Sequence, residues 1–125
     1  MSRYRRVRNQ RTGQLILEKA KWCASFWCHF RGLQFVRHLP EGEALLFVRG
    51  GESISATTIH MFFMFFDIAV VWLDKDRRVV DKRYAKVWCP AYAPHQAAQY
   101  YIEANPSLLA QVEIGDILTF DEDTH

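Results

Sequence analysis

Residues 58–74, TIHMFFMFFDIAVVWLD, are nearly all apolar. Their aromatic and β-branched side chains favour strand over helix, so we expect strands over 59–65 and 68–73. Charged residues at 74–78 then interrupt the apolar pattern, which resumes with two valines. This succession predicts buried strands followed by a hairpin, with the returning strand over 79–87.

Shorter apolar segments, separated by turn residues, lie on both sides of this stretch. Alternation of side-chain character predicts further strands over 14–30 (one or two strands), 44–48, 98–104 and 117–120. We expect only two short helical segments, one within 31–38 and one that begins at Pro106. Many short strands with little helix are typical of a β-sandwich or barrel, so we predict a mainly β fold.

The length and the charge pattern set the domain organisation. A chain of 125 residues suits a single domain, which we place over 13–120. Five arginines fall within residues 1–12, which we expect to be a flexible basic arm, and residues 121–125 form an acidic tail. The net charge is +2, which leaves −3 once those arginines are subtracted. The body is therefore not a basic nucleic-acid surface, and a solvated end is the simpler interpretation of the arm.

The three cysteines, Cys23, Cys28 and Cys89, contain no C-x-x-C pair. If Cys23 and Cys28 share a strand, they point to opposite faces and lie too far apart to form a disulfide. We therefore expect reduced, buried thiols and a cytoplasmic protein. No secretory signal is evident, and the apolar run is shorter than the roughly 20 residues that span a bilayer, so we expect no membrane partner.

Three residues are candidates for ligand binding. His60 lies in an apolar run and must find a partner there or lose its charge. Glu103 shares a strand face with Tyr101, where a carboxylate can orient a ligand or act as a base. Arg31, which precedes Gly32, could hold a carboxylate or phosphate. The simpler alternatives are a core histidine bonded to backbone, a solvated or arginine-paired carboxylate, and a structural ion pair.

Motifs that would indicate an enzyme or a metalloprotein are absent from the sequence. It contains no G-x-S-x-G, no P-loop and no dinucleotide fingerprint. The histidines His29, His60 and His95 do not have the spacing of a metal site. We therefore predict no catalytic residue, no metal and no cofactor.

Several ordered segments together carry a resemblance to a known family. They are Arg31-Gly32-Leu33, Leu39–Leu46, Ile59–Met64, Val70–Asp74, Val79-Val80, Ala98–Glu103 and Ile114-Gly115-Asp116. The chain resembles the bacterial and archaeal domain of unknown function 192 from Gly13 to Phe120. This resemblance implies a compact β-sandwich of jelly-roll type with one or two short helices. It implies no catalytic residues, since that family has no established activity.

Three positions depart from the pattern of that family, one of them where Asn105-Pro106 replaces the glycine usual after the 98–104 strand. Where its members have Pro-Ile-Asp before the central valines, this chain has Asp67-Ile68-Ala69, so the acid lies two residues earlier. Arg77 takes a hairpin position at which the family favours glycine. If that position needs a left-handed backbone, arginine costs about 1 kcal/mol there.

These observations favour a non-catalytic ligand-binding or protein-interaction module of the bacterial cytoplasm, with a small molecule or a protein as its partner. Two alternatives stay open. One is an enzyme whose site is assembled from Arg31, His60 and Glu103 in three dimensions. The other is an oligomeric structural protein in which apolar strands form the interface. A cavity that contains these three residues would favour ligand binding.

Overall fold

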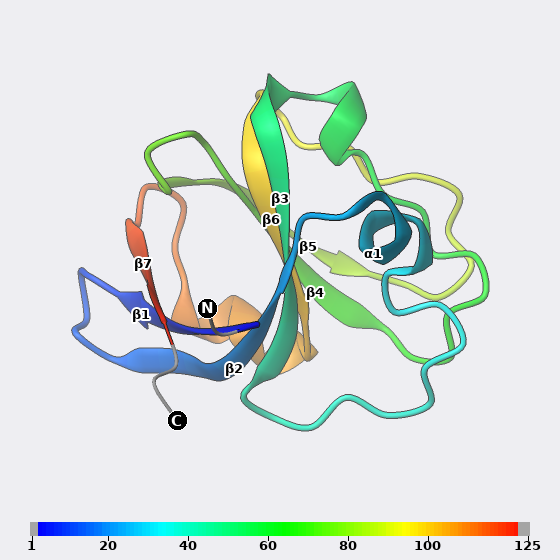
Figure 1. Cartoon of the computed structure of the whole chain (residues 1–125), viewed down its shortest axis with the longest axis horizontal. Helices are drawn as coiled ribbons and strands as arrows, with labels where there is room; N and C mark the ends of the chain where they lie inside the picture. Colours follow the sequence, from blue (N-terminus) through cyan, green and yellow to red (C-terminus); the bar gives the residue numbers. More distant parts are fainter. Residues whose placement is uncertain (1–2, 123–125) are drawn as a thin grey trace.

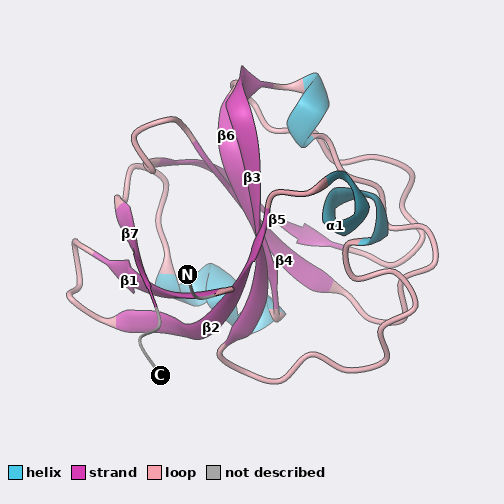
Figure 2. Ribbon diagram, viewed as in Figure 1, coloured by secondary structure: helices cyan, strands magenta, loops and turns pink. Residues whose placement is uncertain are grey.

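Seven strands form the framework of the computed structural model, which describes residues 3–122. They are β1 (Tyr4–Asn9), β2 (Leu15–Cys23), β3 (Glu43–Ser53), β4 (Ile68–Leu73), β5 (Val79–Ala85), β6 (Ala98–Ala104) and β7 (Leu118–Glu122). Helix is limited to α1 (Phe26–Arg31) and two 3₁₀ segments, η1 (Ser55–Thr57) and η2 (Pro106–Gln111) (Figure 2). No helix within residues 3–122 has the length and apolar character needed to cross a membrane.

All seven strands belong to one curled sheet of order β5-β4-β6-β3-β2-β1-β7 (Figure 1). The β2–β3 pair is parallel, and the other neighbouring strands are antiparallel. The predicted mainly β, single-domain fold is confirmed. Its jelly-roll detail is not, because the strands form one sheet that curls over its own core.

The two end strands of the sheet approach each other beside the β4–β5 hairpin. Arg78 forms a bridge with Ile117, and Leu118 N–H donates to the Arg77 carbonyl at 3.0 Å. Arg77 has a φ of 65°, so the left-handed conformation considered for this position is present. Its guanidinium lies 4.5 Å from the centroid of the Phe120 ring, and this cation–π contact offsets part of the backbone cost.

Strand β4 is buried along its whole length because both faces of the sheet are covered. Its alternate side chains Ala69, Val71 and Leu73 join the first core, inside the curl. Ile68, Val70 and Trp72 join the second core, on the opposite face, with Phe47 and Tyr101. Within residues 3–122 there is no second sheet to cover the second core; α1 and the connections around residues 33–39 and 59–66 pack on it instead.

The predicted strand over 59–65 is wrong. Ile59 forms only an isolated bridge with Tyr92, and the segment runs across the sheet as a loop. Met61 and Met64 are buried in the second core, whereas Phe62 and Phe63 are exposed. The buried positions 59, 61 and 64 do not keep the period of two that a strand needs. The apolar composition therefore reflects a covering loop.

The predicted strand over 14–30 is correct only as far as Cys23. Because β2 and β3 are parallel, the chain must cross over between them, and α1 lies in that crossover. The Ser25 hydroxyl caps α1 by accepting a hydrogen bond from Cys28 N–H at 3.2 Å. The helix ends at Gly32, whose φ of 51° favours glycine. The helical turn expected within 31–38 therefore lies earlier in the chain.

The predicted flexible arm over 1–12 is wrong for Tyr4–Asn9. These residues form β1, which pairs with β2 on one side and β7 on the other. Beyond β1, the Arg11 guanidinium donates to Asp116 at 2.6 Å and holds the pKa of that carboxyl down at about 2. At the other end, Asp121 and Glu122 belong to β7, and residues 123–125 of the predicted tail lie outside the described residues.

Candidate functional site

A cavity of about 110 Å³ lies on the second-core side of the sheet, beside α1. Its wall includes all three of the residues proposed from sequence, Arg31, His60 and Glu103. Its other polar side chains are His29, Gln34, Arg49, Thr58 and Tyr101. Among the described residues, no hydrogen bond or ion pair joins any two of Arg31, His60 and Glu103. They share a cavity without forming a connected cluster.

Glu103 is the least ordinary group in this cavity. It lies on β6, between β3 and β4, and its side chain is only 7% exposed. Within residues 3–122 its carboxyl group has no hydrogen-bond or ion-pair partner. Burial raises the pKa of Glu103 from 4.5 to about 8. The solvated and arginine-paired alternatives are therefore wrong, and this carboxyl group is mainly protonated at neutral pH.

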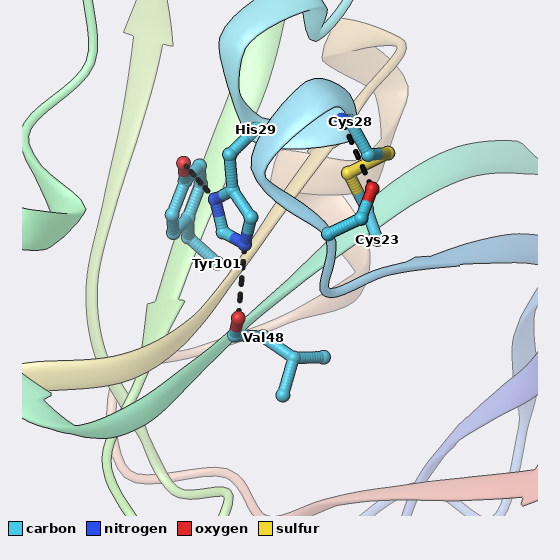
Figure 3. The surroundings of a disulfide bond; sticks show 6 residues. Cys23, Cys28, His29, Val48 and Tyr101 are labelled. Atoms are coloured by element: carbon cyan, nitrogen blue, oxygen red, sulfur yellow. Dashed lines mark hydrogen bonds between the residues drawn. A yellow bond between two sulfur atoms is a disulfide. The ribbon is translucent and has the colours of Figure 1, made fainter.

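His29 fixes α1 to the sheet at the edge of the cavity (Figure 3). Its Nε2–H donates to the Val48 carbonyl at 2.9 Å, so Nδ1 of the neutral ring is the acceptor. The Tyr101 hydroxyl points at that nitrogen from 3.4 Å. Burial lowers the pKa of His29, which favours this neutral form. The sequence did not single out His29 as a ligand-site residue, because its segment had the alternation of a strand.

A disulfide between Cys23 and Cys28 ties α1 to the end of β2, with a Cα–Cα distance of 5.5 Å (Figure 3). The prediction of reduced thiols is wrong for this pair, because the two cysteines do not share a strand. The chain turns after Cys23 and enters the helix, which brings Cys28 back toward the strand end. Cys89 is a free, half-buried thiol. The disulfide removes the cysteine argument for a cytoplasmic location.

We expect reduction of this disulfide to lower the free energy of unfolding by about 2 kcal/mol, because its loop is short. Urea denaturation with and without a phosphine reductant measures the change. A Cys23→Ser, Cys28→Ser double variant should match the reduced parent, and Cys89→Ser should respond to reductant as the parent does. Equal stability of the oxidised and reduced parent would contradict the expected stabilisation.

His60 and Arg31 occupy the accessible side of the cavity, since both are exposed. His60 lies in a loop and its Nδ1 accepts a hydrogen bond from Phe62 N–H at 3.3 Å. The alternative of a buried core histidine is therefore wrong. Arg31 is the last residue of α1, and the structure gives it no ion pair within residues 3–122. Its guanidinium can therefore approach a bound anion.

Arg49 adds a second cation to the cavity wall, and the sequence analysis missed it. It lies on β3, and its Nε–H donates to the Ala56 carbonyl at 2.9 Å, which leaves other guanidinium donors. Nearby, the Phe47 ring stacks on Tyr101 at 4.4 Å and forms the apolar floor. The alternation of 44–48 located this strand, but a lone arginine just beyond it carried no signal.

The match to known proteins covers most of the chain. The model of the DUF192 family, an uncharacterized ACR, matches residues 7–120. The chain belongs to the DUF192 family. This DUF192 chain is 41% identical over 114 residues to a UPF0127 protein of Thermococcus kodakarensis. The aligned region covers 90% of this chain and 71% of that protein. It is 30% identical over 115 residues to a UPF0127 protein of Pyrococcus furiosus, covering 90% and 96%. These relatives are archaeal and do not support the predicted bacterial origin.

Two crystal structures share the DUF192 fold described above. One is a protein of unknown function from Novosphingobium aromaticivorans, with a TM-score of 0.80 and 18% identity over 93% of this chain and 83% of that one. The other is a Sinorhizobium meliloti protein, with a TM-score of 0.83 and 17% identity over 95% of both chains. At these identities the likeness concerns the fold alone.

The departures from the DUF192 pattern have clear structural settings. Ala69 is fully buried in the first core, on the face opposite the cavity. Asp67 lies outside the sheet and accepts hydrogen bonds from the Tyr84 hydroxyl and from Val87 N–H, each at 2.9 Å. The acid at position 67 therefore organises the loop after β5. In residues 3–122, no three His, Cys, Asp or Glu side chains come together as metal ligands would.

Proposed function

We propose that this protein is a non-catalytic binding module, and that the Glu103 cavity binds a small oxyanion such as a short carboxylate. The observation that carries the proposal is a buried carboxyl group with no protein partner, in a cavity whose wall carries two arginines. Polar groups in protein interiors are almost always hydrogen-bonded, and the Glu103 oxygens are not sealed off from the cavity, so a water molecule or a ligand there supplies their partner. The accessible location of Arg31 and His60 provides a route for that ligand.

The hydrogen-bonding character of the cavity favours an acceptor. The protonated carboxyl of Glu103 offers an O–H, as buried carboxylic acids do in some oxyanion sites. Arg31 and Arg49 offer charged N–H donors, which bind carboxylates strongly. His60 uses Nδ1 as an acceptor, so the neutral ring presents Nε2–H. A ligand that only accepts hydrogen bonds matches this set.

The size of the cavity limits the ligand to a few heavy atoms. An apolar cavity of about 150 Å³ accommodates a benzene molecule. The cavity beside Glu103, at about 110 Å³, is smaller. A two- or three-carbon carboxylate fits this space. The apolar floor formed by Phe47 suits the alkyl part of such a ligand.

Calorimetric titration with acetate tests the proposal directly. We expect saturable binding to the parent and about tenfold or greater weakening in Arg31→Ala, because a charge-assisted hydrogen bond is lost. Arg37→Ala is the matched control, since this exposed arginine lies outside the cavity wall. Saturable binding that Arg31→Ala and Arg37→Ala weaken equally would place the ligand elsewhere. Native mass spectrometry of gently purified protein would reveal a retained ligand and the oligomeric state.

Acetate affinity should fall as the pH rises through about 8, the pKa of Glu103. Below that pH the group is neutral and donates; above it, the carboxylate repels the anion. Burial raises the pKa of Tyr101, another group that faces the cavity, and keeps its hydroxyl protonated in this range. Calorimetry from pH 7.5 to 9, above the range in which histidine side chains titrate, should show the loss in the parent and a flatter profile in Glu103→Gln. Affinity that rises with pH would instead indicate a cationic ligand.

The two alternative functions have weaker support. The raised pKa of Glu103 suits a general acid and so supports the alternative of an enzyme assembled from Arg31, His60 and Glu103. However, no hydrogen bond or ion pair joins the three residues in the described part of the chain, so a relay of protons between them lacks a direct path. The mass measured above would decide between an oligomeric structural role and a monomeric one.

A further inference from the structure

Large aromatic side chains are exposed at one end of the molecule, where α1 and three loops lie (right side of Figure 1). Trp27 and Phe26 on α1 are 74% and 72% exposed. We call the following set the aromatic end: Phe26, Trp27, Phe30, Phe35, Phe62, Phe63, Phe65 and Trp88. A buried core does not account for these residues, since each presents a large part of its ring to solvent.

The loops of the aromatic end are tied to one another. Phe35 N–H donates to the Phe63 carbonyl at 2.9 Å, and the two rings stack at 5.2 Å. Trp88 N–H donates to the Met61 carbonyl at 2.7 Å, and its ring lies 5.3 Å from that of Phe63. On α1, the Trp27 ring contacts Phe26 at 5.4 Å. The rings therefore form two groups, a loop array around Phe63 and a separate cluster on α1.

Three aromatic residues of the loop array have an unfavourable backbone conformation. Within residues 3–122, four residues other than glycine have a positive φ, and three of them are Phe35, Phe63 and Trp88. Bulky residues are disfavoured in this conformation, for which glycine or asparagine is better suited. Since neither burial nor backbone preference explains an aromatic residue there, the strain points to a function that needs the exposed ring.

The charge around the aromatic end has one sign. Segments 24–40, 54–66 and 86–100 contain no Asp or Glu, but they contain the cations Arg31, Arg37 and Lys86. The Arg37 guanidinium lies 6.0 Å from the centroid of the Phe65 ring. The adjoining acid Asp67 is held by the loop after β5, where its carboxylate accepts hydrogen bonds from Tyr84 and Val87. A surface that carries aromatic rings among cations complements one that is anionic and amphipathic.

We infer that the aromatic end docks onto an anionic lipid surface, with its rings inserted among the headgroups and its cations beside lipid phosphates. Tryptophan and other aromatic residues favour this interfacial region, and Lys and Arg add attraction to anionic lipids. A second copy is a poorer occupant, because a symmetric contact through this end would bring Arg31, Arg37 and Lys86 of both copies together. Docking of this kind is peripheral and involves no spanning segment.

Co-sedimentation of the full chain with lipid vesicles tests the inference. Vesicles of equal parts phosphatidylcholine and phosphatidylglycerol should retain the parent, and pure phosphatidylcholine should retain much less. A Trp27→Ser, Phe30→Ser variant should lower the partition coefficient by about tenfold or more, since two rings leave the interface. The matched control is Ile114→Ser, because Ile114 is 60% exposed but lies before β7, away from the aromatic end.

A second variant separates docking from folding. Phe63→Asn, Trp88→Asn places residues that tolerate a positive φ at both positions, so it should fold as the parent does and still lose vesicle binding. The inference is overturned if the parent does not sediment with the anionic vesicles at low salt. It is also overturned if both aromatic variants bind them as Ile114→Ser does, or if the substitutions change only self-association.

Discussion

The variant Glu103→Gln is expected to exceed the parent in free energy of unfolding by roughly 3–5 kcal/mol at pH 8 and above, and to match it near pH 4. Glutamine has the shape of the protonated carboxyl group but cannot ionise. The parent must keep a buried acid protonated, or bury a charge, at a pH where the unfolded chain ionises freely. Burial of Glu103, which sets its pKa of about 8, is the cause of the difference.

The direction of this effect follows from the protons bound in each state. Between pH 4.5 and about 8, the unfolded parent has released the Glu103 proton and the folded parent retains it. The stability contribution of this group is therefore complete below pH 4.5 and is lost as the pH rises to about 8. Asp116 acts in the opposite direction, but its pKa of about 2 confines its effect to more acidic solutions.

Urea denaturation at pH 4, 6 and 8 measures both curves, with the midpoint and the slope fitted separately. Glu18→Gln is the matched control, because Glu18 is an exposed glutamate on β2 and should leave the pH profile of the parent unchanged. Parallel profiles for the parent and Glu103→Gln would mean that Glu103 is ionised in the folded protein. Glu103 could then not donate an O–H to a bound anion, and this part of the proposed oxyanion site would fail as well.

A gain of this size would bear on function as well as on stability. Most proteins avoid a buried acid with no partner, since a neutral residue of the same shape costs less. Residues that lower stability in this way concentrate at functional sites. The cavity beside Glu103 gives the acid something to contact other than protein. The free energy of unfolding and the acetate affinity of Glu103→Gln should therefore be measured at the same pH values and compared with those of the parent.

The strands with the clearest patterns were predictable from sequence. Strand β4 is continuous and apolar, as expected for a strand covered on both faces, and β6 shows the alternation that places Glu103 and Tyr101 on one face. That face is the cavity wall, so the pairing of these residues followed from a period of two. His60 and Arg31 reach the same cavity through loop and helix geometry that the sequence pattern does not encode.

The failures share a physical cause. A loop that covers a sheet needs as many apolar residues as a strand, so the composition of 59–65 was misleading. The segment after Cys23 became a helix because β2 and β3 are parallel, and strand pairing depends on residues far away in the chain. The disulfide was missed for the same reason. The mainly β fold was predictable, but the direction of neighbouring strands was not.

Replacement of Trp72 by alanine is expected to lower the free energy of unfolding by about 3–5 kcal/mol, which is a large share of the stability of a small domain. Trp72 is fully buried at the centre of the second core. Its indole N–H donates to the Thr57 carbonyl at 2.7 Å, and this bond ties η1 to β4. The alanine variant leaves both a large void and an unpaired carbonyl group.

Trp72→Phe separates the two contributions, because it keeps most of the ring and removes the N–H donor. Its expected cost is about 1–3 kcal/mol, measured by the same urea denaturation. Trp27→Ala is the matched control: Trp27 is largely exposed, and its loss should change stability by about 0.5 kcal/mol or less. The Thr57 carbonyl lies one residue before Thr58, which lines the cavity. Trp72→Phe should therefore also weaken acetate binding, whereas Trp27→Ala should not. Equal acetate affinities of Trp72→Phe and the parent would show that η1 keeps its position without the indole N–H.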